Sequence, residues 1–357
     1  MAPPSDPHLG RRQFLQAGAG GALLCTIGGR RFALRTPQDT ARADAAARAV
    51  RRPRATAGEP VDGLSFPTPQ PQPGGVAREY WLQARTVTWD IAPTGRDDWH
   101  GRAITQPRHF KAVVYQAMTP GFAAAAGPAM MPGPTLTAEV GDTLVVHFRN
   151  GATALGQALA LHPHGVRYTP DYDGVYLGAH TRAGGFIAPG QEFTYTWEAR
   201  PDSVGAWIYH DHGPNHALNS MRGLFGAIVV RERGAKAPDV EFPLFFGSLT
   251  PPITGLNRPF ETINGRSAAG NTPTLRARVG QDVAMYVFGV DDLFHDFHVH
   301  GHRWQDPGGA NLDTQTVGPA EGIIARWTED NPGRWLYHCH VMAHQDAGMA
   351  GWYLVEP

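Results

Sequence analysis

Short segments of alternating apolar and polar residues, separated by turn residues, are the main pattern of the chain beyond residue 80. Residues 80–82, 85–89 and 111–115 are examples, and Asp, Gly and Pro lie between such segments. Alternation with a period of two is typical of strands that bury one face. The 43 glycines and 31 prolines also favour many turns over long helices. The pattern therefore predicts an all-β fold.

Two of these segments recur in the second half of the chain. Residues 134–141 align without a gap with residues 273–280 through the pattern P-T-L-x-A-x-V-G, and residues 207–212 align with residues 335–340. Duplicated β-rich units of this size are expected from two β-sandwich domains. We predict one domain at residues 76–232 and a second at residues 233–357, joined within the charged segment 231–240.

The N-terminal residues have the layout of an export signal. Gly10-Arg11-Arg12-Gln13-Phe14-Leu15 precedes a weakly apolar Ala/Gly run, an order typical of twin-arginine signals, whose cargo is exported already folded. A disordered basic tail is the alternative. We predict a signal at residues 1–45, a disordered linker at residues 46–75, and a periplasmic or extracellular location.

Net charge, hydropathy and cysteine count argue against nucleic-acid binding, a membrane span and an internal disulfide. The formal net charge of −1 suggests neither nucleic acid nor an acidic membrane surface as a partner. The chain has no run of about 18 uncharged apolar residues, which excludes an ordinary membrane span. Of the two cysteines, Cys25 lies inside the predicted signal, so Cys339 would be the single cysteine of the exported protein and could form no internal disulfide.

Histidines occur in pairs separated by one residue far more often than chance allows. Random placement of 17 histidines over 357 positions gives about 0.8 such pairs. The chain has five, which indicates a metal site: His162/His164, His210/His212, His298/His300, His300/His302 and His338/His340. Two pairs from each domain could place eight imidazoles around three metal ions. Copper suits imidazole ligands well, and zinc is the alternative on ligand type alone.

The segment 335–349 combines soft ligands with imidazoles. On a strand, His338 and His340 face one side and Cys339 faces the other. Cys339 and His344, together with His295 and a weak axial Met349, form the ligand set of a blue-copper site. Two more imidazoles lie on the opposite face, so the sequence predicts two metal sites joined by a few covalent bonds.

Four segments resemble the four copper-binding motifs of the multicopper oxidases: L-H-P-H-G, Y-H-D-H-G, H-D-F-H-V-H-G-H-R-W and Y-H-C-H-V-M-A-H-Q-D-A-G-M. With two domains, residues 80–357 most resemble the bacterial small laccases. The resemblance implies two tandem cupredoxin-like Greek-key β-sandwich domains and four coppers per chain. The implied type 1 ligands are His295, Cys339, His344 and Met349. The implied type 2 ligands are His162 and His298, and the type 3 ligands are His164, His210, His212, His300, His338 and His340.

The resemblance also implies an activity. A laccase-like oxidase takes single electrons from phenols or similar donors at the type 1 copper, passes them through Cys339, His338 and His340, and reduces O₂ to water. Met349 as axial ligand indicates a modest type 1 potential. Near the trinuclear cluster, Asp173 is a candidate proton donor or an ordinary turn residue, and Tyr168 is a candidate electron donor or a packing residue. His216 and His302 have no assigned role.

Because each domain supplies half of the ligands, the cluster is expected at a domain–domain interface. The resemblance to small laccases implies a homotrimer with clusters between chains. A metal-ion oxidase acting on Cu(I), Fe(II) or Mn(II) is an alternative activity. Copper nitrite reductases also have two such domains, but they carry type 1 copper in the first domain, where this chain has Asp211 in place of a cysteine. A simple electron carrier would not need eight additional imidazoles.

Overall fold

The computed structural model describes residues 23–27, 30–34 and 66–357 of the chain. It divides into two units, residues 1–54 and 55–357. In the first unit, strand β1 (Leu23–Ile27) pairs antiparallel with strand β2 (Arg30–Leu34). Most of the predicted signal and linker lies outside the described residues, so both stay predictions.

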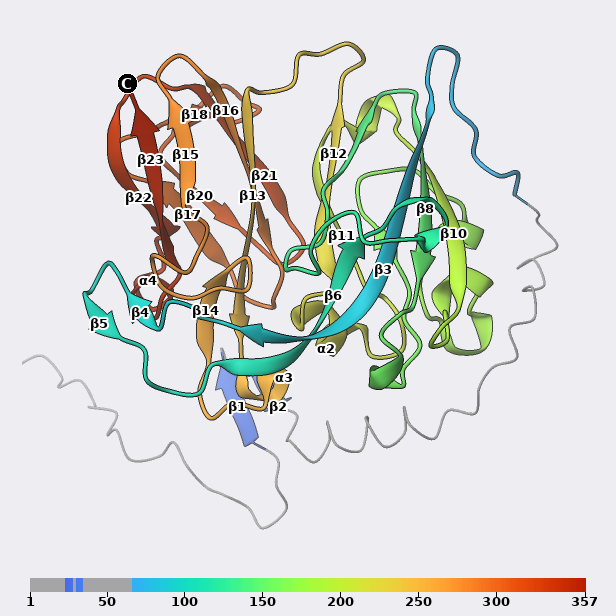
Figure 1. The fold of residues 1–357 in the computed structure, drawn as a ribbon, viewed down its shortest axis with the longest axis horizontal. Coiled ribbons are helices and arrows are strands. Elements are labelled where there is room, and N and C mark those ends of the chain that lie inside the picture. The colour runs from blue at the N-terminus through green and yellow to red at the C-terminus, as the bar shows by residue number, and fades with distance from the viewer. Residues whose placement is uncertain (1–22, 28–29, 35–65) are drawn as a thin grey trace, which may run out of the picture. The chain divides into compact units, whose positions relative to one another are not determined.

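The first β-sandwich is built from two four-stranded sheets of residues 77–231 (Figure 1). One sheet has the order β10-β8-β3-β6, and the facing sheet has the order β7-β12-β11-β9. Alternating side chains from both sheets fill the core, which includes the fully buried rings of Tyr115, Phe148 and Trp197. The strands are β3 (Ala77–Asp90), β6 (His109–Ala117), β7 (Leu136–Glu139), β8 (Thr143–Arg149), β9 (His162–Pro163), β10 (Glu192–Glu198), β11 (Gly205–His210) and β12 (Phe225–Arg231).

The second β-sandwich repeats this plan with a four-stranded sheet, β14-β13-β16-β21, and a five-stranded sheet, β15-β23-β22-β17-β20. Phe246, Phe297 and Tyr337 are among the rings buried between them. The strands are β13 (Val240–Leu249), β14 (Phe260–Ile263), β15 (Leu275–Arg278), β16 (Asp282–Gly289), β17 (His295–Val299), β20 (Thr314–Val317), β21 (Gly322–Thr328), β22 (Gly333–Cys339) and β23 (Ala350–Glu356).

The two sandwiches share a third apolar core. Phe225 from β12 packs on Phe245 from β13 with ring centroids 4.9 Å apart, and Phe245 stacks on Phe288 from β16 at 4.6 Å. Burial of three phenylalanines at one junction is a strong stabilising contribution. This core holds the two sandwiches against each other.

Short elements connect the strands. The α-helices are α2 (His216–Met221), α3 (Pro251–Thr254) and α4 (Met342–Asp346). The 3₁₀ turns are η2 (Pro120–Phe122), η3 (Thr153–Leu155), η4 (Pro170–Tyr172), η5 (Gly178–His180), η6 (Ala183–Gly185) and η7 (Pro201–Ser203). Two small ribbons complete the set: β4 (Arg96–Asp97) with β5 (Arg102–Ala103), and β18 (Trp304–Gln305) with β19 (Asn311–Leu312). Among the described helices none is long and apolar enough to cross a membrane.

In each sandwich, a tyrosine packed opposite a glycine positions the strand that carries histidines. Tyr209 on β11 lies opposite Gly226 on β12, and its hydroxyl donates to the carbonyl of Pro134. Tyr337 on β22 lies opposite Gly351 on β23 and donates to the carbonyl of Pro273. The absence of a side chain on each glycine leaves room for the tyrosine ring. The predictions of an all-β fold and of a duplicated unit are confirmed, whereas the exact domain boundaries stay predictions.

Candidate metal centre

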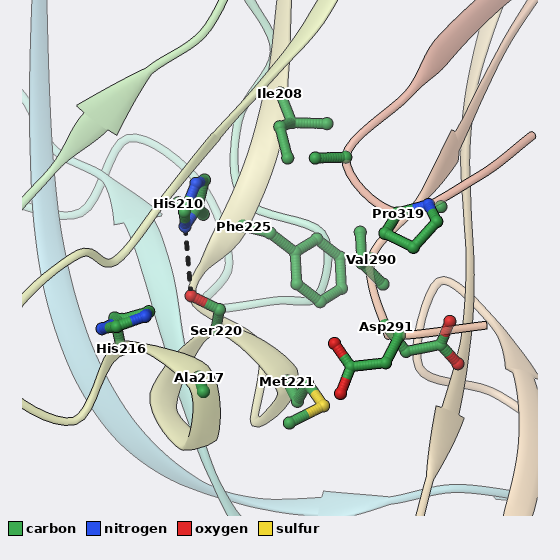
Figure 2. A pocket seen from close by; sticks show the side chains of 13 residues that line it. Ile208, His210, His216, Ala217, Ser220, Met221, Phe225, Val290, Asp291 and Pro319 are labelled. Atoms are coloured by element: carbon green, nitrogen blue, oxygen red, sulfur yellow. Dashed lines mark hydrogen bonds between the residues drawn. The ribbon is translucent and has the colours of Figure 1, made fainter. Parts of the chain in front are cut away.

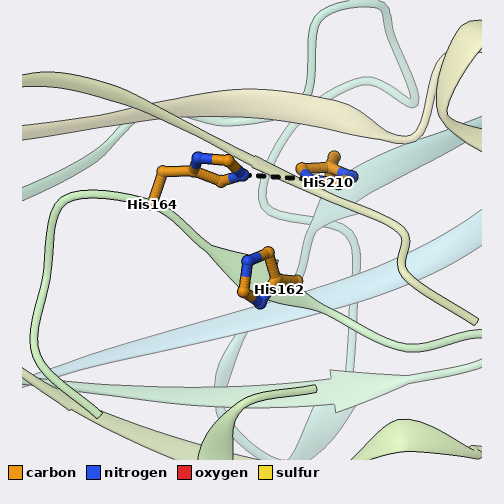
Figure 3. Close-up of side chains that lie close together, drawn as sticks. All are labelled: His162, His164 and His210. Atoms are coloured by element: carbon orange, nitrogen blue, oxygen red, sulfur yellow. Dashed lines mark hydrogen bonds between the residues drawn. The ribbon is translucent and has the colours of Figure 1, made fainter. Parts of the chain in front are cut away.

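Three histidines of the first sandwich converge at one end of β11 (Figure 3). His162 on β9 lies directly opposite His210 on β11, and His164 follows β9 by one residue. One ring nitrogen from each lies within 4.8 Å of the others. The ring of His212 lies 5.3 Å from the ring of His162, at the edge of the same group.

Backbone carbonyls fix the tautomers of these histidines. Nδ1 of His162 donates to the carbonyl of Asp173 at 2.7 Å, and Nδ1 of His210 donates to the carbonyl of Asp211 at 2.9 Å. In each neutral ring the Nε2 lone pair is then available. Nε2 of His210 lies 3.0 Å from Nε2 of His164, a spacing that requires a shared proton or a cation between the two nitrogens. The chemistry of this donor set fits a metal ion.

The second sandwich repeats the arrangement. His298 on β17 lies directly opposite His338 on β22, and one ring nitrogen from each of His298, His300 and His338 lies within 4.8 Å of the others. Nδ1 of His298 donates to the carbonyl of Asp313, and Nδ1 of His338 donates to the carbonyl of Cys339. Nε2 of His300 lies 3.2 Å from Nε2 of His338, and the ring of His340 lies 5.4 Å from that of His338.

Burial keeps several of these imidazoles neutral at physiological pH. Loss of solvent, with a smaller contribution from neighbouring histidines, lowers the pKa of His164 to about 4, of His210 to about 3 and of His338 to about 4. Burial also lowers the pKa values of His212 and His300. Metal binding requires neutral imidazole, so the fold has already removed the competing proton.

A different donor set surrounds Cys339 on the opposite face of β22. Its Sγ lies 3.8 Å from Nδ1 of His295 and 3.7 Å from Nδ1 of His344 on α4. His295 and Cys339 are fully buried, and the side chain of Met349 is buried in the same core. Met349 adjoins Cys339 because its carbonyl accepts the Cys339 N–H at 3.0 Å. A buried thiol with two imidazoles, and with a methionine in the same core, fits copper better than zinc.

The carboxylate of Asp291, which the sequence did not reveal, supports His295 through the ring nitrogen that does not face Cys339. Nε2 of His295 donates to Oδ1 of Asp291 at 3.0 Å. Burial alone would lower the pKa of His295, but Asp291 and Cys339 outweigh it and raise the pKa to about 9. Asp291 lies four residues before His295 in the segment between β16 and β17, and in the sequence it looks like an ordinary acid of a connecting segment.

The place of Cys339 in the first sandwich is taken by Asp211, as the sequence indicated. This fully buried carboxylate accepts hydrogen bonds from the backbone N–H groups of Ala160 and Gly213 and from the side chain of Asn219. His216, which corresponds to His344 in the repeat, stacks on His212 with ring centroids 4.3 Å apart. In the first sandwich this position therefore holds a hydrogen-bonded carboxylate, where the second sandwich has the thiol of Cys339.

The structure places the two secondary candidates beside His162. The ring of Tyr168 lies 5.6 Å from that of His162, and Oδ1 of Asp173 lies 3.2 Å from Nδ1 of His162. His302 points elsewhere: its Nε2 pairs with the buried carboxylate of Glu329 at 2.9 Å. Glu329 does not stand out in the sequence, because it lies in the segment between β21 and β22, where exposed acids are common.

The two histidine sets remain separate within one chain. For residues 66–357, every ring contact among the predicted ligands joins histidines of the same sandwich or His295 to His344. The three ligand groups are likewise separate. One chain thus presents two half-sets of imidazoles and one complete His₂Cys group.

Both sandwiches match family models described as multicopper oxidase, over residues 124–235 and 248–357. Among curated proteins, the chain is 29% identical over 242 residues to a probable nitrite reductase–hydroxylamine oxidoreductase fusion protein of Kuenenia stuttgartiensis, covering 63% of this chain and 28% of that protein. It is 26% identical over 348 residues to hephaestin of Mus musculus, covering 79% and 30%. The chain thus spans less than a third of the length of these relatives.

Solved structures share the fold. A structure titled multicopper oxidase aligns with a TM-score of 0.63 and 24% identity, covering 80% of this chain and 92% of that one. A blue copper oxidase from Nitrosomonas europaea aligns with a TM-score of 0.59 and 23% identity, covering 78% and 86%. A copper nitrite reductase from the same organism also has a TM-score of 0.59, with 17% identity and coverage of 78% and 94%. The predicted two-domain cupredoxin-like fold is confirmed.

Proposed function

We propose that this chain, which belongs to the multicopper oxidase family, is a laccase-like oxidase that takes electrons from small reducing molecules and delivers them to O₂. The observation that carries the proposal is strand β22. It places Cys339 in a buried His₂Cys group on one face, while its neighbours His338 and His340 belong to the imidazole set on the other. An electron carrier would have no use for the second set.

We propose that the chain holds four coppers. His295, Cys339, His344 and Met349 would hold the type 1 copper, and His162 and His298 the type 2 copper. The type 3 pair would be held by His164, His210, His212, His300, His338 and His340. Copper in these positions would supply one-electron oxidation of the donor and reduction of O₂ to water.

The chain itself supplies position, electronic connection and protons. Cys339 is joined to His338 and His340 by single peptide units, which makes a short covalent path between the two faces of β22. Asp173 contacts Nδ1 of His162 through both its carboxylate and its carbonyl. It thereby fixes that ring and offers a proton-transfer group beside the cluster. Tyr168, on the same ring, is a candidate electron donor.

We further propose that the chain works as a homotrimer. Each sandwich presents half of the imidazoles, and the halves have no ring contact within the described part of one chain. A ring of three chains, in which the first sandwich of one faces the second sandwich of the next, would close three identical clusters. A native mass of one chain, measured by light scattering on the copper-loaded protein, would contradict this arrangement.

Metal-ion oxidation is a second candidate. Relatives of this chain include a protein named ferroxidase in Mus musculus, 26% identical over 346 residues and covering 79% of this chain and 29% of that protein. Nitrite reduction is a weaker alternative, because the first sandwich has Asp211, already satisfied by three hydrogen bonds, where a type 1 cysteine would be needed.

Spectroscopy together with oxygen uptake tests the proposal. The copper-loaded protein should contain four coppers per chain, absorb intensely near the red end of the visible spectrum, and give both type 1 and type 2 electron paramagnetic resonance signals. Oxygen consumption with 2,6-dimethoxyphenol should exceed that with Fe(II), Cu(I) or Mn(II). Faster turnover of a metal ion would favour the second candidate, and nitrite turnover without oxygen uptake would overturn both.

We also propose export by the twin-arginine route to the periplasm or beyond the cell. Arg11 and Arg12 stand where that signal places its two arginines. Replacing both with Lys should retain the precursor inside the cell, as fractionation and immunoblotting would show. Export that continued unchanged would contradict the assignment.

A further inference from the structure

The two sides of the His₂Cys group are supported by different parts of the molecule. On the His295 side, Asp291 borders a cavity of about 230 Å³ between the two sandwiches (Figure 2). On the Met349 side, the support is the largely buried segment between β14 and β15, residues 264–272. This segment is bonded in turn to residues 91–103 of the first sandwich, which connect β3 to β6 and include the β4–β5 hairpin. A hydrogen-bonded connection therefore runs from the first sandwich to Met349.

Two hydrogen bonds attach the segment 264–272 to the backbone on either side of Met349. The N–H of Ala268 donates to the carbonyl of Gly348 at 2.7 Å. The hydroxyl of Thr272 donates to the carbonyl of Ala350, also at 2.7 Å. Met349 is fully buried between these two attachments. A shift of the Met349 backbone would therefore stretch or break at least one buried hydrogen bond, which is unfavourable.

The backbone at Ala268 is held in a conformation that it would not adopt by itself. Its φ of 72° lies in the left-handed region, which residues with a Cβ rarely occupy. Such conformations persist only where the surrounding structure imposes them. Here the N–H of Ala268 is bonded to Gly348, and the N–H of the preceding residue, Ser267, donates to the carbonyl of Ile91 at 2.9 Å. The first sandwich and the Met349 backbone thus fix the two adjacent amides.

The first sandwich is also bonded to the end of this segment. The side chain of Asn271 accepts hydrogen bonds from the N–H and the hydroxyl of Thr94, at 2.9 Å and 2.8 Å. The same side chain donates to the carbonyl of Arg96 at 2.8 Å. The N–H of Asp98 donates to the carbonyl of Ala269 at 3.0 Å. Residues of the hairpin region therefore fix the segment at several points, and none of them is a predicted metal ligand.

A second contact joins the hairpin directly to helix α4, which carries His344. Figure 1 shows β4 and β5 beside α4, and the guanidinium group of Arg102 on β5 donates to the carbonyl of Asp346 at 3.2 Å. The buried side chain of Asp97 accepts two backbone N–H groups within the hairpin, which fixes its turn. The hairpin region thus contacts both the segment that holds Met349 and the helix that carries His344.

On the basis of the type 1 ligands proposed above, we propose that residues 91–103 and 264–272 form one clamp that holds Met349 in position as the axial ligand. The reduction potential of such a site is tuned by its axial ligand. A closer donor atom stabilises the more highly charged, oxidised ion, so the clamp keeps the potential low. The first sandwich, which has no His₂Cys group among its described residues, thereby sets the potential at which the second sandwich accepts electrons.

Amide hydrogen exchange of the copper-free, full-length protein tests the clamp without any metal. Asn271→Ala removes three hydrogen bonds with the hairpin region, and Arg102→Ala removes the contact with α4. Each should speed exchange in the peptide that contains residues 346–350 at least about threefold, because local opening no longer breaks these bonds. Asn271→Asp, which keeps the accepting oxygens, should have an intermediate effect. Asn311→Ala, at an exposed position on β19, is the matched control and should exchange as the wild type does.

The copper-loaded protein tests the redox role. In a spectroelectrochemical titration of the blue absorption, Asn271→Ala should raise the equilibrium constant for reduction at least about threefold, and Asn311→Ala should leave it unchanged. Met349→Leu removes the thioether and should raise this constant further. Asn271→Ala added to Met349→Leu should then change little, because the clamp acts through Met349. Two residues that act through one contact are not additive in such a double-mutant cycle.

Three results would overturn the clamp. They are unchanged exchange at residues 346–350 in both clamp variants, an unchanged reduction equilibrium in Asn271→Ala, and simple additivity of Asn271→Ala with Met349→Leu. A blue, oxygen-consuming wild type that gave any of these results would leave the oxidase function standing. A copper-loaded wild type without intense visible absorption would instead overturn the proposed type 1 site, and the redox role of the clamp with it.

Discussion

At the scale of single residues, Cys339 separates the two kinds of chemistry proposed here. It is fully buried between His295 and His344, and its replacement removes the thiolate without removing any imidazole. We expect the Cys339→Ser protein to lose the intense visible absorption. Its oxidase activity should fall more than about hundredfold, because loss of a metal ligand costs more than loss of a residue that only supports a ligand. Visible absorption and oxygen uptake would measure this, with circular dichroism to show that the β fold persists. A blue and active Cys339→Ser protein would contradict the assignment.

Asp142 gives a pH-dependent prediction that is independent of metal. Burial opposes its ionisation, but the N–H of Glu139, the guanidinium groups of Arg78 and Arg233 and the N–H of Val76 outweigh burial and lower its pKa from 3.8 to about 2. A lowered carboxyl pKa stabilises the folded state above pH 4, and that stabilisation is lost as the pH falls toward 2. The shift corresponds to about 2 kcal/mol.

We therefore expect Asp142→Asn to reduce the free energy of unfolding by about 2 kcal/mol at pH 7, because the carboxylate contributes fully there. Between pH 4 and pH 2 the difference from the wild type should narrow. Urea unfolding of the copper-free protein across this pH range would measure it, with exposed Asp202→Asn as the control. A difference that stayed constant with pH would show that Asp142 acts through packing and not through its charge.

Residue identity and spacing singled out the candidate ligands but not the side chains that support them. Histidine pairs and Cys339 stand out in the sequence because their spacing is improbable in an ordinary chain. Asp291 and Glu329 do not, because each is an ordinary acid near a turn and acquires its role from burial against His295 or His302. Burial of a charge depends on contacts between distant segments, and spacing along the chain carries no information about such contacts.

At the scale of elements, the tyrosine–glycine pairs position the ligand strands. A Cβ placed on Gly351 would lie 2.5 Å from the ring of Tyr337, and one on Gly226 would lie 2.4 Å from the ring of Tyr209. We expect Gly351→Ala and Gly226→Ala each to destabilise the protein by about 1–3 kcal/mol through overpacking. Thermal or urea unfolding would show this.

Gly127→Ala is the matched control, because its added Cβ would meet a single atom at 4.0 Å. The Gly351→Ala protein should also bind copper less well in its second sandwich, since the displaced ring lies on the strand that carries His338 and Cys339. An unchanged unfolding midpoint in both variants would show that the tyrosine rings can move aside at no cost.

Element types were predictable because strand periodicity is local, whereas the partners of each strand were not. The match between residues 134–141 and 273–280 correctly indicated equivalent elements: β7 pairs parallel with β12, and β15 pairs parallel with β23. Helix α2 was not foreseen. Its six residues include His216 and Met221, which follow Asp211 at the same spacings as His344 and Met349 follow Cys339. The spacing alone suggests a loop that has lost its metal ligands, whereas in the structure these residues line a cavity.

At the scale of the whole molecule, the location of the shared cluster depends on which chains meet. The sequence indicated that each domain carries half of the imidazoles, and the structure brings each half together by itself. Spacing cannot show whether the halves join within a chain or between chains, because that depends on a surface formed only after both sandwiches have folded. Complementation between two inactive variants distinguishes these possibilities.

In one variant His162 and His164 are replaced by Ala, and in the other His298 and His300 are replaced. Each variant alone should be inactive, because every cluster lacks one half. Suppose that clusters form between chains of a closed ring and that the two variants are co-expressed one to one. At each junction, the first sandwich is intact with a probability of about one half, and so is the second. About one quarter of the junctions should therefore join two intact halves. Oxygen uptake per copper-loaded protein should therefore recover to about a quarter of the wild-type level, with doubly substituted chains as the inactive control. If clusters form within a chain, mixing restores nothing, and the proposed trimer is wrong.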